Sequence, residues 1–478
     1  MATPPTCPDS LQAKIDAASS GGTVIAYPCV YREQVTIDKP LTLKGQSGSE
    51  IRGSDIWSRW TYSGGYWQSD DTLPHFPQPP EVECMPDTSR CLWPEQVFFD
   101  DEPLQQVAPD QEPQSGQFAV DAERRVVLAD DPEGHQVEVT VRRHWVLGKA
   151  SNVTLEGFTM KHAANEGRSG AIMNRMSRLD PGHSNWVVQD NMVSDAHGAV
   201  VNLRGGTGNK LLDNDISRGG QLGVRSGSAG YLVRGNKIHD NNTEDFYWGW
   251  EAGGFKAAST SAMVVDGNEV YNNKGNGVWC DVGCKDITYS NNRIHHNARR
   301  GIHYEISSGG RIFGNVAWEN GWATPNRANG AGIGVSNSTD TEIYSNTLAW
   351  NADGIGITGL DRNGTDHDLV LNIHVHHNTI LMQDLPGEDL TNHFALGWIS
   401  GWSPQMFDPD SNNRGEGNVY WYPDPEGDLV RFEWEKTGYP ELEDFEATPG
   451  EEGGRYLTQA EKDAVVADKS LPTNSEPR

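Results

Sequence analysis

The chain has 478 residues, of which 36% are hydrophobic, and its formal net charge is −29. A surface this acidic repels phosphates, which argues against nucleic acid as a partner. The sequence contains no apolar run long enough to cross a bilayer, and its N-terminal MATPPTCPDS lacks the basic and apolar regions of a signal peptide. We therefore expect neither a membrane segment nor a leader peptide.

The N-terminal part predicts a capped repeat with an insertion. SLQAKIDAA is short and amphipathic, as expected of a segment that covers an open end, and residues 21–53 read as two coils of the repeat that dominates the later chain. We assign residues 1–57 to the cap and first coils. Residues 58–147 contain aromatics, prolines and alternating strands such as RRVVLAD and VEVTVRRH, so we expect an inserted β-module there.

Residues 148–425 carry a repeat built on the unit Asn-x-apolar-x-x-Asn. Its shortest intervals are 22, 23 and 24 residues, with three short apolar strands and no helical periodicity, which predicts one turn of a parallel β-helix. An amide both donates and accepts, so recurring asparagines should form a hydrogen-bonded ladder. The leading residues are Asn236, Asn268, Asn292, Asn315 and Asn346, with degenerate copies at Asn191, Asn214 and Asn378.

The third strand of each coil can be aligned by its glycine. In this register the inward positions are nearly all apolar, for example Phe255, Val278 and Ile302. The outward positions then bring Asp281 and Glu305 onto neighbouring strands. The outward residues around this pair are Trp279, His303, Lys256, Arg225 and Asn202.

Three long insertions, 162–170, 241–254 and 321–330, precede the aligned third strand and should overhang the same face. The middle insertion holds Trp248 and Trp250, aromatic residues of the kind that stack on sugar rings. The alternative for these tryptophans is a small core within the loop. Glu251 lies at the mouth of this loop.

After residue 425 the chain turns to Pro, Gly, Asp and Glu, and we expect 426–478 to form an irregular acidic tail packed on the coils. The six cysteines form three pairs close in sequence, Cys7 with Cys29, Cys84 with Cys91, and Cys280 with Cys284. Proximity favours these disulfides and an oxidising, extracellular setting, and buried free thiols are the alternative.

The sequence resembles the right-handed parallel β-helix enzymes of the pectate-lyase-like superfamily. The resemblance is carried by GGTVIAYPCVYREQVTI and by the Asn-x-apolar coils. The insertion, with EQVFFDDEPLQQV and GQFAVDAERRVVLADDPEG, is similar to a module in bacterial glycoside hydrolases of the β-xylosidase and α-fucosidase/xylanase families. The resemblance implies an all-β fold and an active groove over the third strands, but β-helices also serve as lyases, epimerases, esterases, adhesins and phage tailspikes.

The paired carboxylates favour glycoside hydrolysis, in which one carboxyl protonates the leaving oxygen and a second acts as nucleophile or base. Asp281 and Glu305 meet this need, and Glu251 is a third candidate. Their proximity should leave one of the pair protonated unless a cation compensates. The structural alternative is a calcium site or a solvated acidic ladder.

Two other functions stay open. In a polysaccharide lyase or epimerase, Lys256, Arg225 or His303 would act as base and calcium would be held by the two acids. A glycan-binding module without activity would also use the aromatic loop. HVHHN (374–378) could indicate a metal, but we expect these histidines, with His162, His295 and His296, to face solvent. We expect no resident metal or cofactor, a monomer, a poly- or oligosaccharide as substrate, and secretion.

Overall fold

The computed structural model describes residues 5–78, 80, 83–324, 328–362, 369–383, 393–424 and 429–474. The chain divides into two compact units, residues 1–225 with 241–252, and residues 226–240 with 253–478. Within the described ranges, no helix is both long and apolar enough to span a bilayer.

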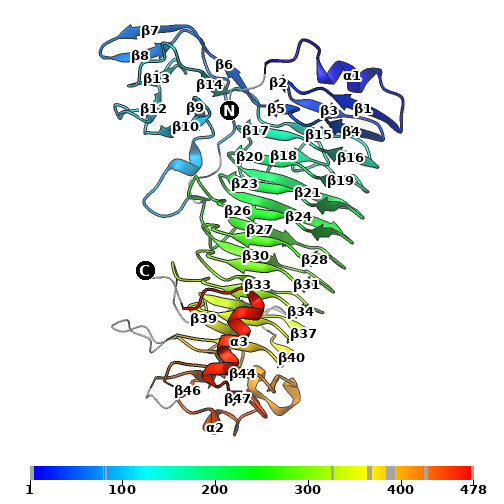
Figure 1. Ribbon diagram of the computed structural model, residues 1–478, viewed down its shortest axis with the longest axis vertical. Helices are drawn as coiled ribbons and strands as arrows, with labels where there is room; N and C mark the ends of the chain where they lie inside the picture. Colours follow the sequence, from blue (N-terminus) through cyan, green and yellow to red (C-terminus); the bar gives the residue numbers. More distant parts are fainter. Residues whose placement is uncertain are drawn as a thin grey trace. The chain divides into compact units, whose positions relative to one another are not determined.

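Each coil of the second unit gives one strand to each of three parallel sheets (Figure 1). Sheet I contains β25 (Leu232–Arg234), β28 (Val264–Asp266), β31 (Thr288–Ser290), β34 (Arg311–Phe313), β37 (Thr339–Tyr344), β40 (Leu371–His376) and β43 (Arg414–Glu416). Sheet II contains β26 (Lys237–His239), β29 (Glu269–Tyr271), β32 (Arg293–His295), β35 (Val316–Trp318), β38 (Thr347–Ala349), β41 (Thr379–Leu381), β44 (Val419–Trp421) and β47 (Arg455–Tyr456). Sheet III contains β27 (Gly253–Ala258), β30 (Asn276–Asp281), β33 (Ile302–Glu305), β36 (Ala331–Ser336), β39 (Asp353–Gly359), β42 (Leu396–Ser400) and β45 (Phe432–Glu435). The predicted all-β fold, a parallel β-helix, is confirmed.

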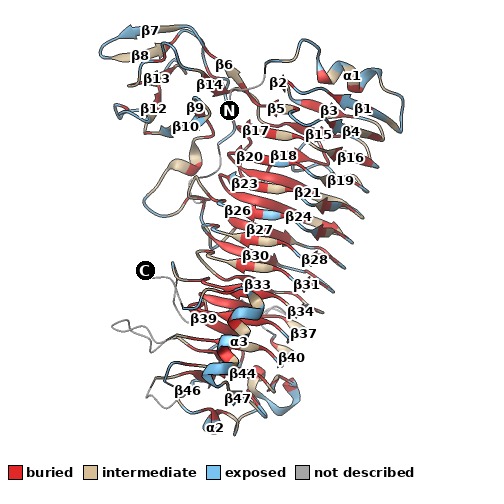
Figure 2. Ribbon diagram, in the orientation of Figure 1, coloured by how far each residue is buried: buried red, intermediate tan, exposed pale blue. Residues whose placement is uncertain are grey.

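Sheet III of this unit has the register that the sequence predicts. Phe255 pairs with Val278, Val278 with Ile302, and Ile302 with Ile333, and all of them are buried. Figure 2 shows these strands as predominantly buried. The same register makes Asp281 the partner of Glu305.

The asparagine ladder is also confirmed. Nδ2 of Asn268 donates to Oδ1 of Asn292 at 3.0 Å, and Nδ2 of Asn292 donates to Oδ1 of Asn315 at 2.9 Å. In the second unit the row runs from Asn236 through Asn346 and Asn378 to Asn418, and in the first unit Asn191 donates to Asn214 in the same way. A second row links the closing asparagines of the motif, Asn273, Asn297, Asn320 and Asn351. These amides satisfy turn backbone that would otherwise be buried without partners.

The first unit has three parallel sheets of the same kind. Sheet I contains β1 (Gly22–Ala26), β4 (Leu41–Gly45), β16 (Val153–Glu156), β19 (Val187–Gln189) and β22 (Lys210–Leu212). Sheet II contains β2 (Val30–Tyr31), β5 (Glu50–Arg52), β17 (Thr159–Ala163), β20 (Met192–Ala196) and β23 (Asp215–Gly219). Sheet III contains β3 (Val35–Ile37), β15 (Val146–Gly148), β18 (Gly170–Met173), β21 (Ala199–Thr207) and the start of β24 (Leu222–Ala229). Helix α1 (Leu11–Ala17) begins after its N-cap, Ser10, and buries Leu11 and Ile15.

Mostly antiparallel strands interrupt these coils between Ser54 and Thr140, whereas the sequence analysis expected the insert at 58–147. One sheet runs in the order β10 (Glu102–Pro103), β9 (Val97–Phe99), β14 (Val137–Thr140) and β6 (Ser54–Ile56). The other runs in the order β11 (Gln105–Gln106), β12 (Gln117–Val120), β13 (Val126–Leu128), β8 (Tyr66–Ser69) and β7 (Trp60–Ser63). The insert has its own apolar core, which includes Phe118, Val126, Leu128 and Val139. The parallel coils resume when β15 pairs with β3.

The coils extend past the expected boundary at residue 425, because β45 and β47 still pair in parallel with the preceding coil. Helix α2 (Leu442–Phe445) lies between them, and β46 (Thr437–Tyr439) pairs antiparallel with β45. Helix α3 (Gln459–Lys469) follows the last coil (Figure 1). It begins after a capping box at Thr458. Val466 of α3 and Leu471 pack on Trp318 and Trp350, so this final segment covers sheet II.

All six cysteines are paired, and the three disulfides are Cys7–Cys29, Cys84–Cys91 and Cys280–Cys284, as proximity predicted. The third disulfide closes a short ring around Asp281. Chain geometry next to a candidate carboxylate is therefore held covalently.

Candidate functional site

Asp281 and Glu305 end two neighbouring strands of sheet III in the second unit, β30 and β33, and point outward while Cys280 and Tyr304 point inward. Such partners lie about 4.8 Å apart. Nζ of Lys256, on β27, lies 2.9 Å from Oδ2 of Asp281 and 3.5 Å above the ring of Trp279. A lysine therefore compensates the charge of Asp281, as the sequence analysis allowed.

Glu305 has different partners. Nε1 of Trp279 donates to its Oε2 at 3.1 Å, and Arg362 forms an ion pair with its Oε1. The side chain of Glu305 is 9% exposed and that of Asp281 is 17% exposed. Each carboxylate thus has its own cation, and the carboxylate of Asp281 is more exposed to solvent than that of Glu305.

His303 stacks on Trp279 with ring centroids 5.4 Å apart, and its Nε2 lies 3.3 Å from Oγ of Ser336 and 3.7 Å from Oε2 of Glu305. Burial lowers the pKa of His303 well below its ordinary value, and Arg300, Arg299 and Lys256 lower it further, so the ring is neutral near pH 7. Within the described part of the chain, its buried Nδ1 has no hydrogen-bond partner. A neutral imidazole with one unused nitrogen can bind a hydroxyl.

The backbone is strained directly after both carboxylates. Val282 has φ 50° and Ile306 has φ 48°, in the left-handed region that β-branched residues rarely adopt. In neighbouring coils the equivalent turns use Ser259 and Asn337, and asparagine tolerates this conformation better. Strain of about 1–2 kcal/mol per residue is typical of sites whose geometry serves a function.

The third predicted loop covers part of this face. A Cβ at Gly356, an outward position of β39, would lie 2.7 Å from Cβ of Ala328, and one at Gly334 would lie 2.5 Å from Cδ of Arg300. Nε of Arg300 donates to the carbonyl oxygen of Ala328 at 2.8 Å. The loop therefore lies beside Glu305 on the C-terminal side, although its residues 325–327 fall outside the described residues.

Arg225 and Glu251 belong to the first unit, where they form an ion pair. Glu251 accepts from Nε of Arg225 at 2.5 Å and lies 2.8 Å from Nε of Arg168. The guanidinium of Arg168 stacks on Trp250 at 3.6 Å. Nδ2 of Asn202 donates to the carbonyl oxygen of Arg168 at 2.8 Å, so the structure brings these predicted residues together.

This first-unit cluster contains more cations than carboxylates. Arg175, which is buried, contacts only neutral oxygens, those of Asp180 and Asn202, at 3.4 Å, as far as the described residues go. Burial and, to a smaller extent, the nearby guanidinium groups of Arg225 and Arg204 together lower the pKa of Arg175 to about 10. In a chain of net charge −29, a local surplus of arginines suits an acidic ligand.

The aromatic loop is tied to the insert of the same unit. Tyr247 donates its backbone N–H to Glu83, and Phe246 forms a bridge with Cys84. Trp248 packs against the cluster formed by Phe246 and the Cys84–Cys91 disulfide. Trp248 thus takes part in the small loop core named as its alternative, while Trp250 contacts the arginine cluster. Whether either touches a ligand stays a prediction.

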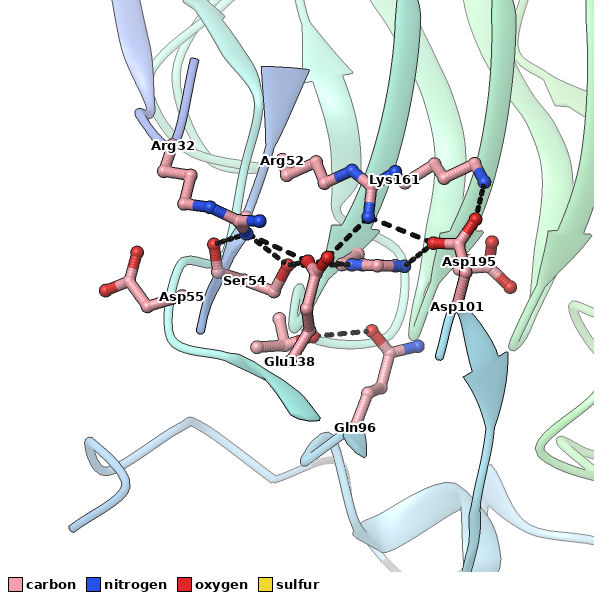
Figure 3. Close-up of polar contacts among 12 residues, drawn as sticks. Arg32, Arg52, Ser54, Asp55, Gln96, Asp101, Glu138, Lys161 and Asp195 are labelled. Carbon is pink, nitrogen blue, oxygen red and sulfur yellow. Dashed lines mark hydrogen bonds and ion pairs between the residues drawn. The ribbon is translucent and has the colours of Figure 1, made fainter. Parts of the chain in front are cut away.

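A second carboxylate cluster joins the insert to the coils of the first unit (Figure 3). Glu138 is fully buried and accepts from Arg52 at 2.6 Å, Arg32 at 2.8 Å and Ser54 at 2.5 Å. Burial alone would raise the pKa of Glu138, but hydrogen bonds from His162 and Arg32 outweigh it and hold the pKa well below its ordinary value. The prediction that His162 faces solvent is wrong, since it is buried against Phe98 with ring centroids 3.6 Å apart.

Several site residues escaped the sequence analysis. Arg362 follows the end of β39, and Arg300 precedes Gly301 in the loop ARR, so neither occupies a repeating strand position. Arg168 and Arg175 lie in or after the first long insertion. The insertion marked that segment as functional, but no periodicity identified the individual residues.

Comparison with known proteins identifies the fold. The family described as "Right handed beta helix region" matches residues 181–348. The structure of XylC in complex with xylose is 15% identical, with a TM-score of 0.66 over 89% of this chain and 83% of that one. The A-module of the mannuronan C-5 epimerase AlgE6 of Azotobacter vinelandii is 15% identical, with a TM-score of 0.57 over 94% of each chain. No curated protein matches the chain. The fold is a right-handed parallel β-helix.

Proposed function

We propose that this protein is a glycoside hydrolase that acts on a poly- or oligosaccharide. The observation that carries the proposal is the register of β30 and β33, which makes Asp281 and Glu305 neighbours on one face. Hydrolysis of a glycosidic bond uses two such carboxyl groups. XylC, which shares the fold, was solved with the sugar xylose, and this supports a carbohydrate substrate.

In this mechanism Asp281 and Glu305 divide the roles of general acid and of nucleophile or base between them. Trp279 and Arg362 orient Glu305, and Lys256 orients Asp281. Nδ1 of His303, which has no partner among the described residues, binds a sugar hydroxyl. Glu251 is the weaker candidate for an acid, because two arginines already share its carboxylate.

The reaction as proposed needs no metal. Lys256 and Arg362 already supply positive charge to the two carboxylates, so calcium would have to displace both. Treatment with a chelator should leave turnover unchanged. Loss of turnover that added calcium restores would replace this part of the proposal with a calcium site.

We also propose that the protein is secreted and acts as a monomer. The three disulfides support the first point, since disulfides persist in oxidising compartments. The net charge of −29 argues against nucleic acid as a partner.

A panel of neutral and acidic polysaccharides tests the activity. New reducing ends without ultraviolet-absorbing unsaturated products indicate hydrolysis, and unsaturated products indicate elimination. A panel on which wild type and Asp281→Asn behave alike would contradict any reaction at this pair.

The surplus of arginines in the first unit favours a second candidate, a lyase or epimerase acting on an acidic polysaccharide. Arg175 and Arg204 would neutralise a sugar carboxylate, which elimination and epimerisation require. The epimerase AlgE6, named for mannuronan, shares the fold. Activity confined to uronate polymers, with unsaturated or epimerised products, would favour this candidate.

A further inference from the structure

A group of side chains with metal-binding chemistry lies on sheet I of the second unit, away from the strands that carry Asp281 and Glu305. His374 and His376 are two residues apart on β40, and both point outward because Ile373 and Val375 fill the core. Glu342, on the neighbouring strand β37, is the register partner of His374. Two imidazoles and one carboxylate therefore come from two adjacent coils.

The donor atoms are close enough to share one ion. One ligand atom each from Glu342, His374 and His376 can be chosen so that all three lie within 4.8 Å of one another. On β43, Glu416 places Oε2 3.2 Å from Nε2 of His374. A cavity of about 540 Å³ on this sheet, lined in part by Glu342 and His374, gives an ion and its waters access.

Aromatic stacking holds one of the imidazoles in place. The ring of His376 lies 5.1 Å from that of Tyr344 at an interplanar angle of 6°, and Tyr344 stacks on Phe313 at 5.0 Å. Neutral imidazole is the form that binds metals. Because stacking already fixes the ring of His376, this ring loses little conformational entropy when it binds an ion.

Arg414 is the one group that opposes an ion. Its Nη2 donates to Nδ1 of His374 at 3.2 Å, which leaves the ring proton on Nε2, facing Glu416. For a metal to bind Nε2, Arg414 must release Nδ1 and the ring proton must move there. Arg414 is thus a competing cation and not a ligand.

We propose that Glu342, His374 and His376 bind one divalent transition-metal ion of the zinc class, with Glu416 or water completing the coordination. Imidazole ligands favour zinc and its neighbours, whereas calcium and magnesium prefer all-oxygen sites. The ion would tie consecutive coils together. This site is independent of the proposed reaction at Asp281 and Glu305, and it departs from the expectation that these histidines only face solvent.

Calorimetric titration of chelator-stripped full-length protein with Zn²⁺ tests the proposal. His374→Gln and His376→Gln should each weaken binding at least about tenfold, since loss of even an outer-shell partner costs about 10–100-fold. His135→Gln, which removes a half-exposed histidine of the insert, is the matched control and should leave binding unchanged. Arg414→Gln should bind at least as tightly as wild type.

Three results would overturn the proposal. They are equal Zn²⁺ binding by wild type and the His374→Gln/His376→Gln double variant, weaker binding by Arg414→Gln, and Ca²⁺ competing as well as Zn²⁺. If a variant does not fold, the position of the bound zinc in wild-type crystals tests the proposal. An anomalous diffraction peak between Glu342, His374 and His376 in zinc-soaked crystals supports the site, and a peak only elsewhere contradicts it.

Discussion

Two carboxylate clusters in this molecule contain the same residue types but differ in the surroundings of the carboxylate. In the first unit Glu138 is fully buried and bound by Arg32, Arg52 and Ser54. In the second unit Asp281 retains solvent exposure and has one lysine at 2.9 Å. Both clusters contain a buried histidine. The clusters differ in how many donors meet the carboxylate and in how much water reaches it.

This difference separates a structural cluster from a candidate for chemistry. A buried carboxylate surrounded by donors is held in its charged form and has no capacity to bind a ligand. A partly exposed carboxylate beside a second one, with an unused imidazole nitrogen nearby, can still interact with a substrate. Substitutions in the first cluster should therefore change stability, and those in the second should change turnover.

Glu138→Ala should have the largest effect, because it removes the buried carboxylate that joins Arg32 to Arg52, although Arg52 keeps its ion pairs with Glu50 and Asp101. Removing one partner of a buried ion pair costs about 3–5 kcal/mol of unfolding free energy. Denaturant unfolding measures the loss. Glu123→Ala, in the same insert but with an exposed side chain, is the control and should be nearly neutral. If the two variants were equally stable, Glu138 would not anchor the insert.

A third carboxylate, Glu451, sharpens the comparison because its pKa shifts in the opposite direction. Burial raises the pKa of Glu451 from 4.5 to about 7, against hydrogen bonds from Tyr420 and Asn418. The folded state then binds the proton more tightly than the unfolded state, so stability falls as pH rises from about 4.5 to about 7, by about 3 kcal/mol.

Unfolding free energies of wild type and Glu451→Gln at about pH 5 and about pH 8 measure this effect. In Glu451→Gln the free energy of unfolding should fall much less between these two pH values, since glutamine does not titrate. Glu138 should have the opposite effect on stability. Its pKa is lowered in the folded state, so its contribution to stability is lost as pH falls below the ordinary pKa of a glutamate, about 4.5. An unchanged pH dependence in Glu451→Gln would contradict the assignment.

Asp281→Asn and Glu305→Gln should each reduce turnover at least about a hundredfold, or about 2.7 kcal/mol, while the fold survives. Steady-state kinetics on the best substrate of the panel measure the loss, and circular dichroism checks the fold. The exposed carboxylate Glu123, changed to Gln, serves as control. Near-normal turnover of both site variants would make the pair a surface ladder.

His303→Gln should reduce kcat/KM roughly fivefold, since one hydrogen bond contributes about 1 kcal/mol. The ring of His303 is neutral near pH 7, so the variant should keep the dependence of kcat/KM on pH that the wild type has. A pH-dependent limb near the ordinary histidine pKa that disappears in the variant would show that His303 titrates during catalysis.

Trp250→Ala should have the smallest effect, weakening substrate binding by a few tenths to about 1 kcal/mol through lost stacking. Trp248→Ala, in the loop core, should instead lower stability. Binding isotherms and thermal unfolding of both variants separate the two roles. Unchanged binding in the double variant would remove the aromatic loop from the site.

The sequence predicted the coils because their positions repeat. Alternation through Phe255, Val278 and Ile302 set the register, and the register paired Asp281 with Glu305. Contacts between non-repeating segments left no such signal. Arg52 and Arg32 reach Glu138 across 86 and 106 residues of chain, and Arg362 reaches Glu305 from a loop. Contacts of this kind depend on tertiary packing, and the spacing of residues along the sequence does not predict them.

The asparagine row has a direction. Each Nδ2 donates toward the C-terminal end, and the last, that of Asn418, donates to Oε2 of Glu451 at 2.7 Å. Aligned amides add their dipoles, as peptide units do in a helix, so the positive end of the row meets a carboxylate. The carboxyl of Glu451 accepts here from both Asn418 and Tyr420, and one reversed amide in the row would bring two donors face to face. The acceptor at the end therefore fixes the orientation of the whole row, giving a β-protein the polarity usually associated with helices.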